Sequence, residues 1–358
     1  MTIVAPEVAA PSLRPPAARL LDVGDRAPFV HAPDHVGNHA STGIDRLAGK
    51  PILLLFCPWL DETCLDAFRS LATEAALFAI SRQGIEANAA AHDRLSLPFA
   101  ILADTRADLF KGYGVDPLPA APSATLFVLD SGHRVARLLD RMEPAAMAAV
   151  ALAELRRLAD ARPAATLQAH PPVLALPRML SLEDCAFLAA VWRRDVPEYP
   201  TDGFANAGTK QEAGDFKVVH DGGYGRAVEY IVQDEALQRF IDGRLRRRLL
   251  PEIKKAFQAG GLQREGYRIA GYEARAGAYL NPHRDNSTPT NARRRFTMTV
   301  NLNAGEYQGG ELRFREYGEQ LCAVERGTAI VWSASLLHEV LPVTKGRRLV
   351  LGVHMFGP

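Results

Sequence analysis

The chain has 358 residues, a length that suits two domains, and 47% of its residues are hydrophobic, which is enough for packed cores. Its formal net charge of +1 argues against a general electrostatic attraction to nucleic acid or to acidic membranes. No apolar run approaches the length of a membrane-spanning helix, and no basic segment followed by an apolar one opens the chain, so we expect neither a membrane anchor nor a signal peptide.

The cysteines and arginines set two further expectations. Cys57, Cys64, Cys185 and Cys322 form no CxxC pair and no dense framework, which is typical of a reducing compartment and predicts a cytoplasmic protein. Arginine outnumbers lysine 35 to 7 by count along the whole chain, so a local arginine cluster is weak evidence for a partner site. We therefore interpret residues 244–248 first as a solvated helix face, with a partner site as the alternative.

The first half of the chain alternates between strand and helix patterns. Residues 1–18 are rich in Ala and Pro and are expected to form a flexible arm. The continuous apolar run at 51–56 predicts a buried parallel strand, and 65–80 has helical spacing. Further strands are expected at 99–102 and 124–129, a turn and hairpin strand at 130–139, and an amphipathic helix at 144–158. This alternation predicts an α/β domain.

Several pieces of this half carry a family resemblance. They are Leu54-Leu55-Phe56-Cys57-Pro58 leading to Cys64, then the stretches 97–104, 113–115 and 126–130. They resemble the thioredoxin-like fold, specifically the peroxiredoxin branch, over residues 19–160. In that family a Pro is followed by three residues, a Thr, two residues and the reactive Cys, whereas here Thr63 directly precedes Cys64, and the expected Arg before the later strand is missing. The resemblance therefore implies a degenerate peroxiredoxin-like domain.

Two interpretations of Cys64 and Cys57 remain open. As redox thiols, they would need a stabilised thiolate, which a helix N-terminus or nearby Arg69 would favour and Asp61 and Glu62 would oppose. Alternatively, they are half-buried small apolar residues in a retained scaffold.

The second half begins after a linker. Residues 161–172 contain three prolines and are expected to be semi-rigid. The second domain, 173–358, opens with a strand and a helix at 182–193. A Gly-rich polar stretch at 199–225 is expected to form a mobile loop over the active site. A helix interrupted or restarted at Pro251 follows over 233–257, and the chain is strand-like from 267 onward.

Three residues of this half suggest a metal site. His283 and Asp285 are two apart, so on an extended strand their side chains leave the same face, and His338 could complete the set. Two imidazoles and one carboxylate on one face of a metal leave the opposite positions open, an arrangement suited to non-haem Fe(II) oxygenases.

The pieces 283–285, 296–303, 309–314, 327–332 and 338–348 resemble, in order and spacing, the double-stranded β-helix (jelly-roll, cupin-like) core of Fe(II)/2-oxoglutarate dioxygenases, most closely the prolyl 4-hydroxylase-like group. Residues 171–257 share the resemblance more weakly. It implies that His283, Asp285 and His338 hold Fe(II), and that a basic residue after the second histidine binds the C5 carboxylate of 2-oxoglutarate.

Arg347 and Arg348 are the two candidates for that carboxylate. They face opposite sides of one strand, and we favour Arg348 because a paired guanidinium requires the inward face, where Gly352 would leave room. The same alternation would turn His354 inward, so that it lines the pocket without touching the metal. Tyr272 and Thr299 are secondary candidates for contacts to the co-substrate, although Tyr272 could be only a packed aromatic residue.

The function implied by the resemblance is hydroxylation of an unactivated C–H bond with O2, releasing succinate and CO2, with ascorbate as a candidate reductant. The substrate would be prolyl, amino-acid-like or another small metabolite, free or peptidyl, with no nucleic acid or membrane partner; a homodimer is conceivable. Asp285 argues against the related halogenases. Arg284, Arg293, Arg294 and Arg295 could receive an acidic substrate or be solvated loop charges. The alternatives are a thiol peroxidase that uses Cys64, with the barrel as a secondary module, and a non-enzymatic iron or 2-oxoglutarate sensor.

Overall fold

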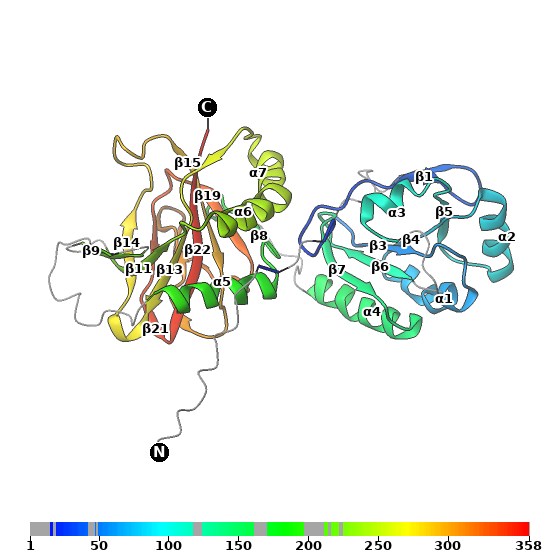
Figure 1. Cartoon of the computed structure of the whole chain (residues 1–358), viewed down its shortest axis with the longest axis horizontal. Helices are drawn as coiled ribbons and strands as arrows, with labels where there is room; N and C mark the ends of the chain where they lie inside the picture. The colour runs from blue at the N-terminus through cyan, green and yellow to red at the C-terminus, as the bar shows by residue number, and fades with distance from the viewer. Residues whose placement is uncertain are drawn as a thin grey trace, which may run out of the picture. The chain divides into compact units, whose positions relative to one another are not determined.

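The computed structural model describes residues 15–16, 19–41, 47, 49–116, 124–160, 170–196, 211–213, 216–221 and 225–357. It contains two compact units, Ala18–Leu167 and Gln168–Pro358, called here the N-terminal and C-terminal domains (Figure 1). The division between them falls within the stretch predicted as a linker. Residues 161–169 of that stretch, and residues 1–14 and 17–18 of the predicted arm, lie outside the described residues.

The N-terminal domain is built on a five-stranded sheet in the order β5-β4-β3-β6-β7. The strands β3, β4 and β5 are parallel, whereas β6 runs antiparallel to β3 and to β7. Their bounds, with those of the small hairpin β1–β2, are β1 His31–Pro33, β2 His39–Ser41, β3 Ile52–Phe56, β4 Ala76–Ser81, β5 Ala100–Ala103, β6 Thr125–Leu129 and β7 Val135–Asp140.

Helices cover both faces of this sheet, which explains the unbroken apolar run of β3. Leu53 and Leu55 pack in one core with α1 and α4, while Ile52, Leu54 and Phe56 pack in a second core with α3. All five residues of β3 are fully buried. The helices are α1 Glu62–Ala67, α2 Ile85–Leu95, α3 Asp108–Tyr113 and α4 Pro144–Asp160. This arrangement confirms the predicted α/β thioredoxin-like class.

One predicted element of this domain is wrong. The helical spacing at 65–80 corresponds to the end of α1, a 3-10 helix at Arg69–Thr73 and the strand β4. Leu77, Ala79 and Ile80 of β4 are buried between the two layers of helices. A short apolar run that is buried on both faces has no hydrophobic periodicity by which a strand can be distinguished from a helix. The helix prediction was therefore wrong for the residues of β4.

The C-terminal domain is dominated by antiparallel strands. The strand order is β18-β17-β20-β14-β11-β13-β22-β15-β19-β8, with β10 and β9 continuing from β11, β12 beside β22, and a separate pair β16-β21. The bounds are β8 Leu174–Leu176, β9 Gln211–Ala213, β10 Phe216–Asp221, β11 Gly225–Ile231, β12 Gln263–Arg264, β13 Arg268–Glu273, β14 Tyr279–His283, β15 Arg294–Asn301, β16 Gln308–Gly309, β17 Leu312–Arg313, β18 Leu321–Cys322, β19 Ala329–Ser333, β20 His338–Val340, β21 Val343–Lys345 and β22 Arg347–Phe356.

Two groups of these strands form the walls of one cavity. The first contains β11, β13, β22, β15 and β19, and the second contains β14, β20 and β17; they meet where β11 pairs with β14. Alternate residues of β22 separate the two sides of the first wall. Leu349, Leu351 and Val353 lie in the outer core, whereas Arg348 and His354 line the cavity. The domain is a double-stranded β-helix, as the sequence predicted.

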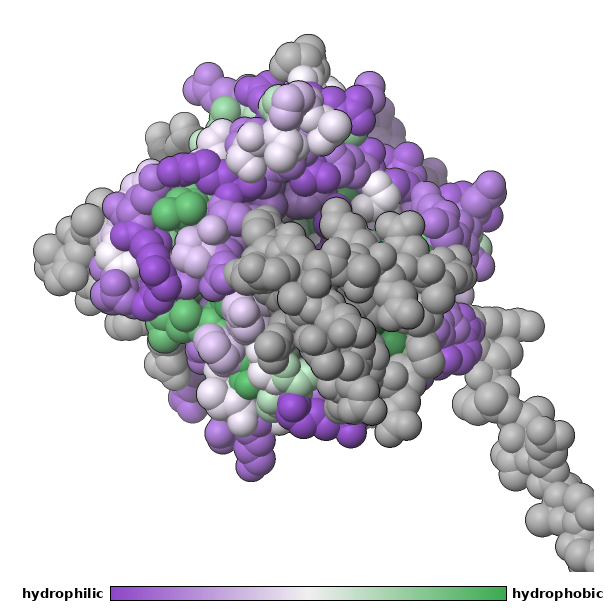
Figure 2. Space-filling model, turned by 90° about the vertical axis from the view of Figure 1, so that its left-hand side faces the viewer, coloured by the Kyte–Doolittle hydropathy of each residue, from purple (hydrophilic) through white to green (hydrophobic). Residues whose placement is uncertain are grey.

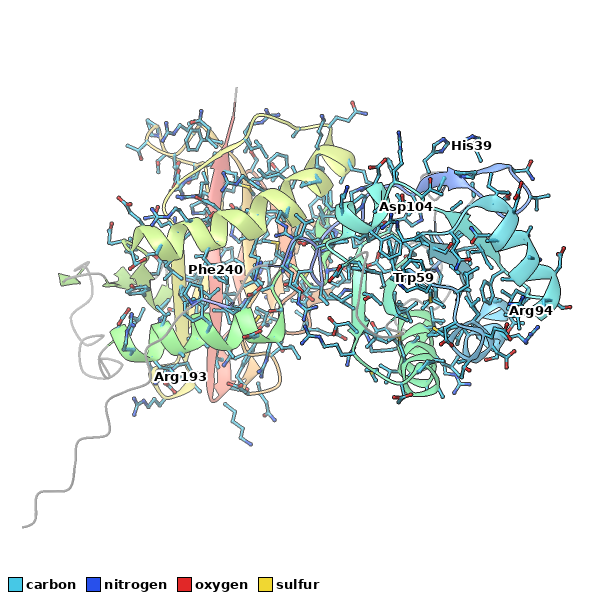
Figure 3. The ribbon with its side chains drawn as sticks, turned by 45° about the vertical axis from the view of Figure 1, so that its right-hand side comes forward. His39, Trp59, Arg94, Asp104, Arg193 and Phe240 are labelled. Carbon is cyan, nitrogen blue, oxygen red and sulfur yellow. The ribbon has the colours of Figure 1, made fainter. Side chains whose placement is uncertain are left out.

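The outer face of the first wall is covered by α5 Leu182–Asp195, α6 Glu235–Arg244 and α7 Leu250–Phe257 (Figure 1). Figure 3 shows Phe240 on α6 and Arg193 on α5. The ring of Phe240 packs edge to face on Phe187 of α5, with 5.5 Å between the ring centroids. A π-helical turn at Leu245–Leu249 joins α6 to α7, and Pro251 lies in the first turn of α7, where the α-helix restarts as predicted.

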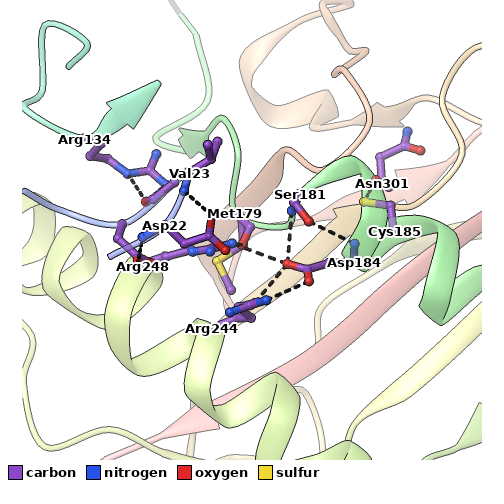
Figure 4. Close-up of polar contacts among 12 residues, drawn as sticks. Asp22, Val23, Arg134, Met179, Ser181, Asp184, Cys185, Arg244, Arg248 and Asn301 are labelled. Atoms are coloured by element: carbon purple, nitrogen blue, oxygen red, sulfur yellow. Dashed lines mark hydrogen bonds and ion pairs between the residues drawn. The ribbon is translucent and has the colours of Figure 1, made fainter. Parts of the chain in front are cut away.

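The interpretation of residues 244–248 as a solvated face is wrong for two of its arginines. Arg244 and Arg248 are buried, and both guanidinium groups pair with the buried Asp184 of α5 (Figure 4). Arg244 binds it through two bonds of 2.9 Å, and Arg248 also donates to the Met179 carbonyl. Asp184 also belongs to the capping box that begins at Ser181. Its carboxylate therefore both caps the N-terminus of α5 and pairs with the buried charges of Arg244 and Arg248.

The stretch 199–225 was predicted to be a loop over the site. Of it, the structure describes the strands β9 and β10 and the first residue of β11, so that the loop prediction is wrong there. The remainder lies outside the described residues.

No described helix is long and apolar enough to cross a membrane. The coloured part of the C-terminal domain's face in Figure 2 is mainly hydrophilic, with hydrophobic residues in small separate patches.

Candidate functional site

His283, Asp285 and His338 converge at one end of the cavity. His283 ends β14 and His338 begins β20, and the two residues are direct cross-strand partners. His283 Nε2 lies 3.7 Å from Asp285 Oδ1, and His338 Nε2 lies 3.5 Å from Asp285 Oδ2. One potential ligand atom from each residue falls within 4.8 Å of the others. The structure thus brings together the three residues that the sequence singled out.

The orientation of both imidazoles suits metal binding. His283 Nδ1 lies 2.7 Å from the Asn281 carbonyl, and His338 Nδ1 lies 2.9 Å from the Leu336 carbonyl. A carbonyl can only accept, so each ring carries its proton on Nδ1 and presents the Nε2 lone pair to the shared point. Burial lowers the pKa of His338, which keeps this ring neutral. The donor set fits a divalent metal with open positions.

A hydrogen bond network holds the carboxylate of Asp285. Thr297 Oγ1 donates to Asp285 Oδ2 at 2.5 Å and lies 3.1 Å from His354 Nδ1. Burial raises the pKa of Asp285, but His338, His354 and the Thr297 hydroxyl outweigh it and hold the pKa below its ordinary value. Burial lowers the pKa of His354 to about 3, so its ring is neutral near pH 7. His354 lines the cavity, as predicted. It does not belong to the group of His283, Asp285 and His338 that could hold a metal ion, which is called here the metal-ligand cluster.

Arg348 is a buried cation at the other end of the cavity. Only 7% of its surface is exposed, and its guanidinium lies over the ring of Tyr272, 5.2 Å from the centroid. No hydrogen bond or ion pair joins it to an acidic group among the described residues. A buried charge without a partner is costly, so this guanidinium fits an anionic ligand in the cavity.

Arg347 lies on the opposite face of β22, as the alternation predicted. Its guanidinium pairs with Glu273 at 2.6 and 2.7 Å and lies over the Trp192 ring. Of the two neighbouring arginines, only Arg348 lines the cavity.

The cavity holds about 530 Å³ and includes both ends of this site. Tyr272 and Thr299, the secondary candidates, also line it. Tyr272 is buried, and burial raises its pKa to about 12, so its hydroxyl remains a hydrogen bond donor at neutral pH. The volume is within the range of small-molecule sites.

Glycines adjoin two of the arginines that line the cavity, but not as predicted. We expected Gly352 to leave room for Arg348, whereas a Cβ on Gly352 would lie 3.4 Å from Arg268 Cγ. Gly310 is the residue that Arg348 approaches, because a Cβ there would lie 2.9 Å from Arg348 Cδ. Gly310 also has a φ of +73°, which L-residues rarely adopt.

The four arginines proposed as receptors of an acidic substrate have different surroundings. Arg284 pairs with Glu316, and Arg294 holds Glu265 through bonds of 2.7 and 2.8 Å. The guanidinium of Arg293 stacks on the Phe356 ring. Arg295 is exposed and is not among the residues that line the cavity.

Cys57 and Cys64 form a buried pair in the N-terminal domain. Their sulfur atoms are 3.5 Å apart, and both thiols are free. The hydrogen bond with Cys64, followed by burial, raises the pKa of Cys57 well above its ordinary value. Asp61 caps α1 by accepting from the Cys64 N–H, and Arg69 donates to the Leu95 and Ser96 carbonyls. The predicted helix N-terminus is present at Cys64. The Arg69 guanidinium, however, binds these two carbonyl groups and not the Cys64 thiol.

The sequence of the C-terminal domain matches one protein family. Residues 267–355 match the 2OG-Fe(II) oxygenase superfamily. The matched oxygenase segment contains all three residues of the metal-ligand cluster and Arg348, so the resemblance recognised from the sequence is confirmed.

Curated relatives that the chain matches include PKHD-type hydroxylases. One from Saccharophagus degradans is 44% identical over 64 residues, which are 17% of this chain and 28% of that protein. Another from Psychrobacter is 31% identical over 121 residues, which are 33% of this chain and 43% of that protein. The chain therefore spans less than half of the length of these relatives.

Solved structures are similar to each half. A Pseudomonas putida prolyl-4-hydroxylase is 22% identical and covers 53% of this chain and 95% of its own, with a TM-score of 0.38. The peroxidoxin BcpB from Mycobacterium tuberculosis is 24% identical and covers 38% of this chain and 98% of its own, with a TM-score of 0.35.

The cavity residues that were not anticipated include Thr297, Arg268 and Glu229. Thr297 lies two residues before Thr299, so the alternation along β15 could have found it. Glu229 comes from β11, which precedes the matched segment, and Arg268 lies at the start of that segment. Nothing in their local sequence marks either residue.

Proposed function

We propose that this chain is an Fe(II)- and 2-oxoglutarate-dependent dioxygenase that hydroxylates an unactivated C–H bond. His283, Asp285 and His338 hold the iron, and Arg348 binds the C5 carboxylate of 2-oxoglutarate. The observation that carries the proposal is the pairing, within one cavity, of this three-residue cluster with a buried guanidinium that has no acidic partner among the described residues. The match of residues 267–355 to the oxygenase superfamily supports it.

The residues of the chain have separate tasks in this reaction. When bound, iron with 2-oxoglutarate and O2 supplies the oxidising chemistry that yields succinate, CO2 and a hydroxylated product. Arg348 orients the co-substrate by a charge-assisted hydrogen bond, and Tyr272, which lines the same cavity, is a candidate second donor. Thr297 fixes the direction of the Asp285 carboxylate. Leu312, Trp332 and Val340 supply apolar walls that limit the access of water.

The substrate class proposed at this level is a prolyl, amino-acid-like or small-metabolite molecule. The relatives named as PKHD-type hydroxylases and prolyl-4-hydroxylase support hydroxylation as the reaction. We propose ascorbate as a reductant that restores oxidised iron, to be tested by adding it to and omitting it from the assay.

Anaerobic spectroscopy tests the proposal most directly. Addition of Fe(II) and 2-oxoglutarate to the apoprotein should produce a weak visible charge-transfer band, and exposure to air should then release succinate. Neither signal should appear with His283→Ala. The matched control is His170→Ala, because His170 is an exposed histidine of the same domain outside the cavity. A band without succinate in air would indicate a binding module instead of an enzyme, and the absence of both would refute the proposal.

The thiol peroxidase alternative gains no support from the described geometry of Cys57 and Cys64. Both side chains are buried, and the raised pKa of Cys57 disfavours the reactive thiolate. We propose an accessory role for the N-terminal domain.

A further inference from the structure

We propose that Arg268 and Glu229 recognise the substrate, and that this substrate is a free α-amino acid held by its carboxylate and its ammonium group. The inference rests on the oxygenase function proposed above and narrows its substrate class. It starts from two oppositely charged side chains that line the cavity and that can accept or donate further hydrogen bonds.

Arg268 has fewer hydrogen bonds than Arg284 and Arg294, the other arginines that line the metal side of the cavity. Its guanidinium lies 3.8 Å from Glu229 Oε1 and 3.9 Å from Glu265 Oε2, both beyond hydrogen bond distance. Arg294 already occupies both oxygens of Glu265. No hydrogen bond joins the Arg268 guanidinium to any described residue, although its side chain is only 25% exposed.

Glu229 is the acidic member of the pair. Its side chain is 15% exposed, and its one ion pair among the described residues is the 3.8 Å contact with Arg268. It lies on the same face of β11 as Ala227, which packs in the inner cluster with Tyr272. Its carboxylate therefore faces the cavity, and no hydrogen bond donor among the described residues binds it.

The register of the strands places this pair away from the co-substrate end. Arg268 pairs with Gly352, and Tyr272 pairs with Arg348, so the two arginines are separated by four residues along these strands. Four residues of β-strand span about 13 Å. Gly352 also pairs with Thr299. The next pair that faces the cavity is His354 with Thr297, and the Thr297 hydroxyl donates a hydrogen bond to Asp285. Arg268 thus lies between the co-substrate end and the metal-ligand cluster along this wall.

The opposite charges select the kind of ligand. A ligand with a carboxylate alone would be attracted by Arg268 but repelled by Glu229. A ligand with an ammonium group alone would be attracted by Glu229 but repelled by Arg268. An α-amino acid carries both charges on one carbon, so its carboxylate can accept two hydrogen bonds from Arg268 while its ammonium donates to Glu229. A residue within a peptide carries neither charge there. The geometry therefore points to a free amino acid in preference to a peptidyl substrate.

Binding to the anaerobic protein loaded with Fe(II) and 2-oxoglutarate tests the proposal without turnover. The probes are the L-α-amino acids found in proteins, each with its N-acetyl derivative, which lacks the ammonium group, and its amide, which lacks the carboxylate. Calorimetry should show at least one amino acid that binds on the order of 10-fold or more tightly than both of its derivatives.

Variants then assign each charge. Arg268→Gln should remove the preference for the amino acid over its amide, and Glu229→Gln should remove the preference over the N-acetyl derivative. The control Arg293→Gln should keep both preferences, because Arg293 stacks on Phe356 and is not a cavity-lining residue. Unchanged 2-oxoglutarate binding shows that each variant is folded. The comparison of each amino acid with its two derivatives is made on the unaltered protein and so does not depend on the folding of any variant.

Three results would overturn the inference. A proline peptide blocked at both ends could bind as tightly as any amino acid; either variant could keep its preference; or no amino acid could bind while 2-oxoglutarate does. The last result would leave the oxygenase function standing. Failure of 2-oxoglutarate itself to bind would remove that function and the inference together.

Discussion

Arg347 and Arg348 are adjacent in sequence, but their guanidinium groups lie on opposite faces of β22. Arg347 pairs with Glu273 and lies over Trp192, whereas Arg348 lines the cavity over Tyr272. The difference follows from the two-residue period of a strand. It separates a structural ion pair, made by Arg347, from the charge that we propose binds 2-oxoglutarate.

Arg348→Ala should therefore weaken 2-oxoglutarate binding much more than Arg347→Ala. Removing one partner of a buried charge pair costs about 2–5 kcal/mol of binding free energy. Loss of the Arg347–Glu273 pair should instead appear mainly in stability. Equilibrium titration of the Fe(II)-loaded variants without O2 measures both affinities, and equal losses would contradict the assignment.

Gly310→Ala should displace Arg348 from its position. The new Cβ would lie 2.8 Å from Val343 Cγ2 and 2.9 Å from Arg348 Cδ. A positive φ costs an L-residue about 1–2 kcal/mol in any case. Gly305→Ala is the matched control, since Gly305 has a φ of +93° and a Cβ added to it would meet nothing within 4 Å. Both variants should lose stability, but only Gly310→Ala should also lose 2-oxoglutarate affinity; loss of affinity in both would show that the backbone, not the contact, is responsible.

Thr297→Val should weaken metal binding without unfolding the domain. The substitution removes the 2.5 Å hydrogen bond to Asp285 and keeps the shape of the side chain. Loss of such a supporting partner typically costs about 10–100-fold in metal affinity or activity. The Fe(II) dissociation constant measures the effect, with the exposed Thr344→Val as control. An unchanged constant would mean that Asp285 needs no support from Thr297.

Asp242 should contribute stability that is lost in acid. Burial raises the pKa of Asp242, but Arg264 and Tyr267, which both donate to it at 2.6 Å, outweigh this and hold the pKa below its ordinary value. Because the folded pKa is depressed, the contribution is complete above the unfolded pKa of about 3.9 and disappears as the pH falls through the folded value.

Urea unfolding of the C-terminal domain between about pH 5 and pH 3 measures this contribution. The free energy of unfolding should fall less steeply with decreasing pH in Asp242→Asn than in the unaltered protein. Glu235→Gln on the same helix is the control, because Glu235 is 85% exposed and an exposed pair contributes little. Parallel pH profiles for Asp242→Asn and the unaltered protein would rule out the linkage.

Hydrogen peroxide consumption should be no faster in the unaltered protein than in Cys64→Ser. The burial of Cys57 and Cys64 and the raised pKa of Cys57 disfavour thiolate chemistry. A peroxide electrode or dye assay measures the rate. Rapid consumption that Cys64→Ser abolishes would restore the peroxidase interpretation of this domain.

The limits of prediction from the sequence follow from the range of the interactions involved. The strand β3 was predicted because a short apolar run reports burial on both faces, whereas β4, equally buried, was assigned to a helix because such a run has no diagnostic period. Arg244 and Arg248 were assigned to solvent because their partner, Asp184, lies about 60 residues away in the chain.

The sequence by itself determined the two-part organisation, the fold classes and the identity of the four residues on which the proposed chemistry depends: His283, Asp285, His338 and Arg348. It could do so because motif spacing and strand alternation are local properties of the chain. Only the tertiary structure decided that Gly310 adjoins Arg348, that Thr297 holds Asp285, and that Arg268 and Glu229 share the cavity. Those relationships depend on the register between strands distant in sequence, which is set by the packing of the whole barrel.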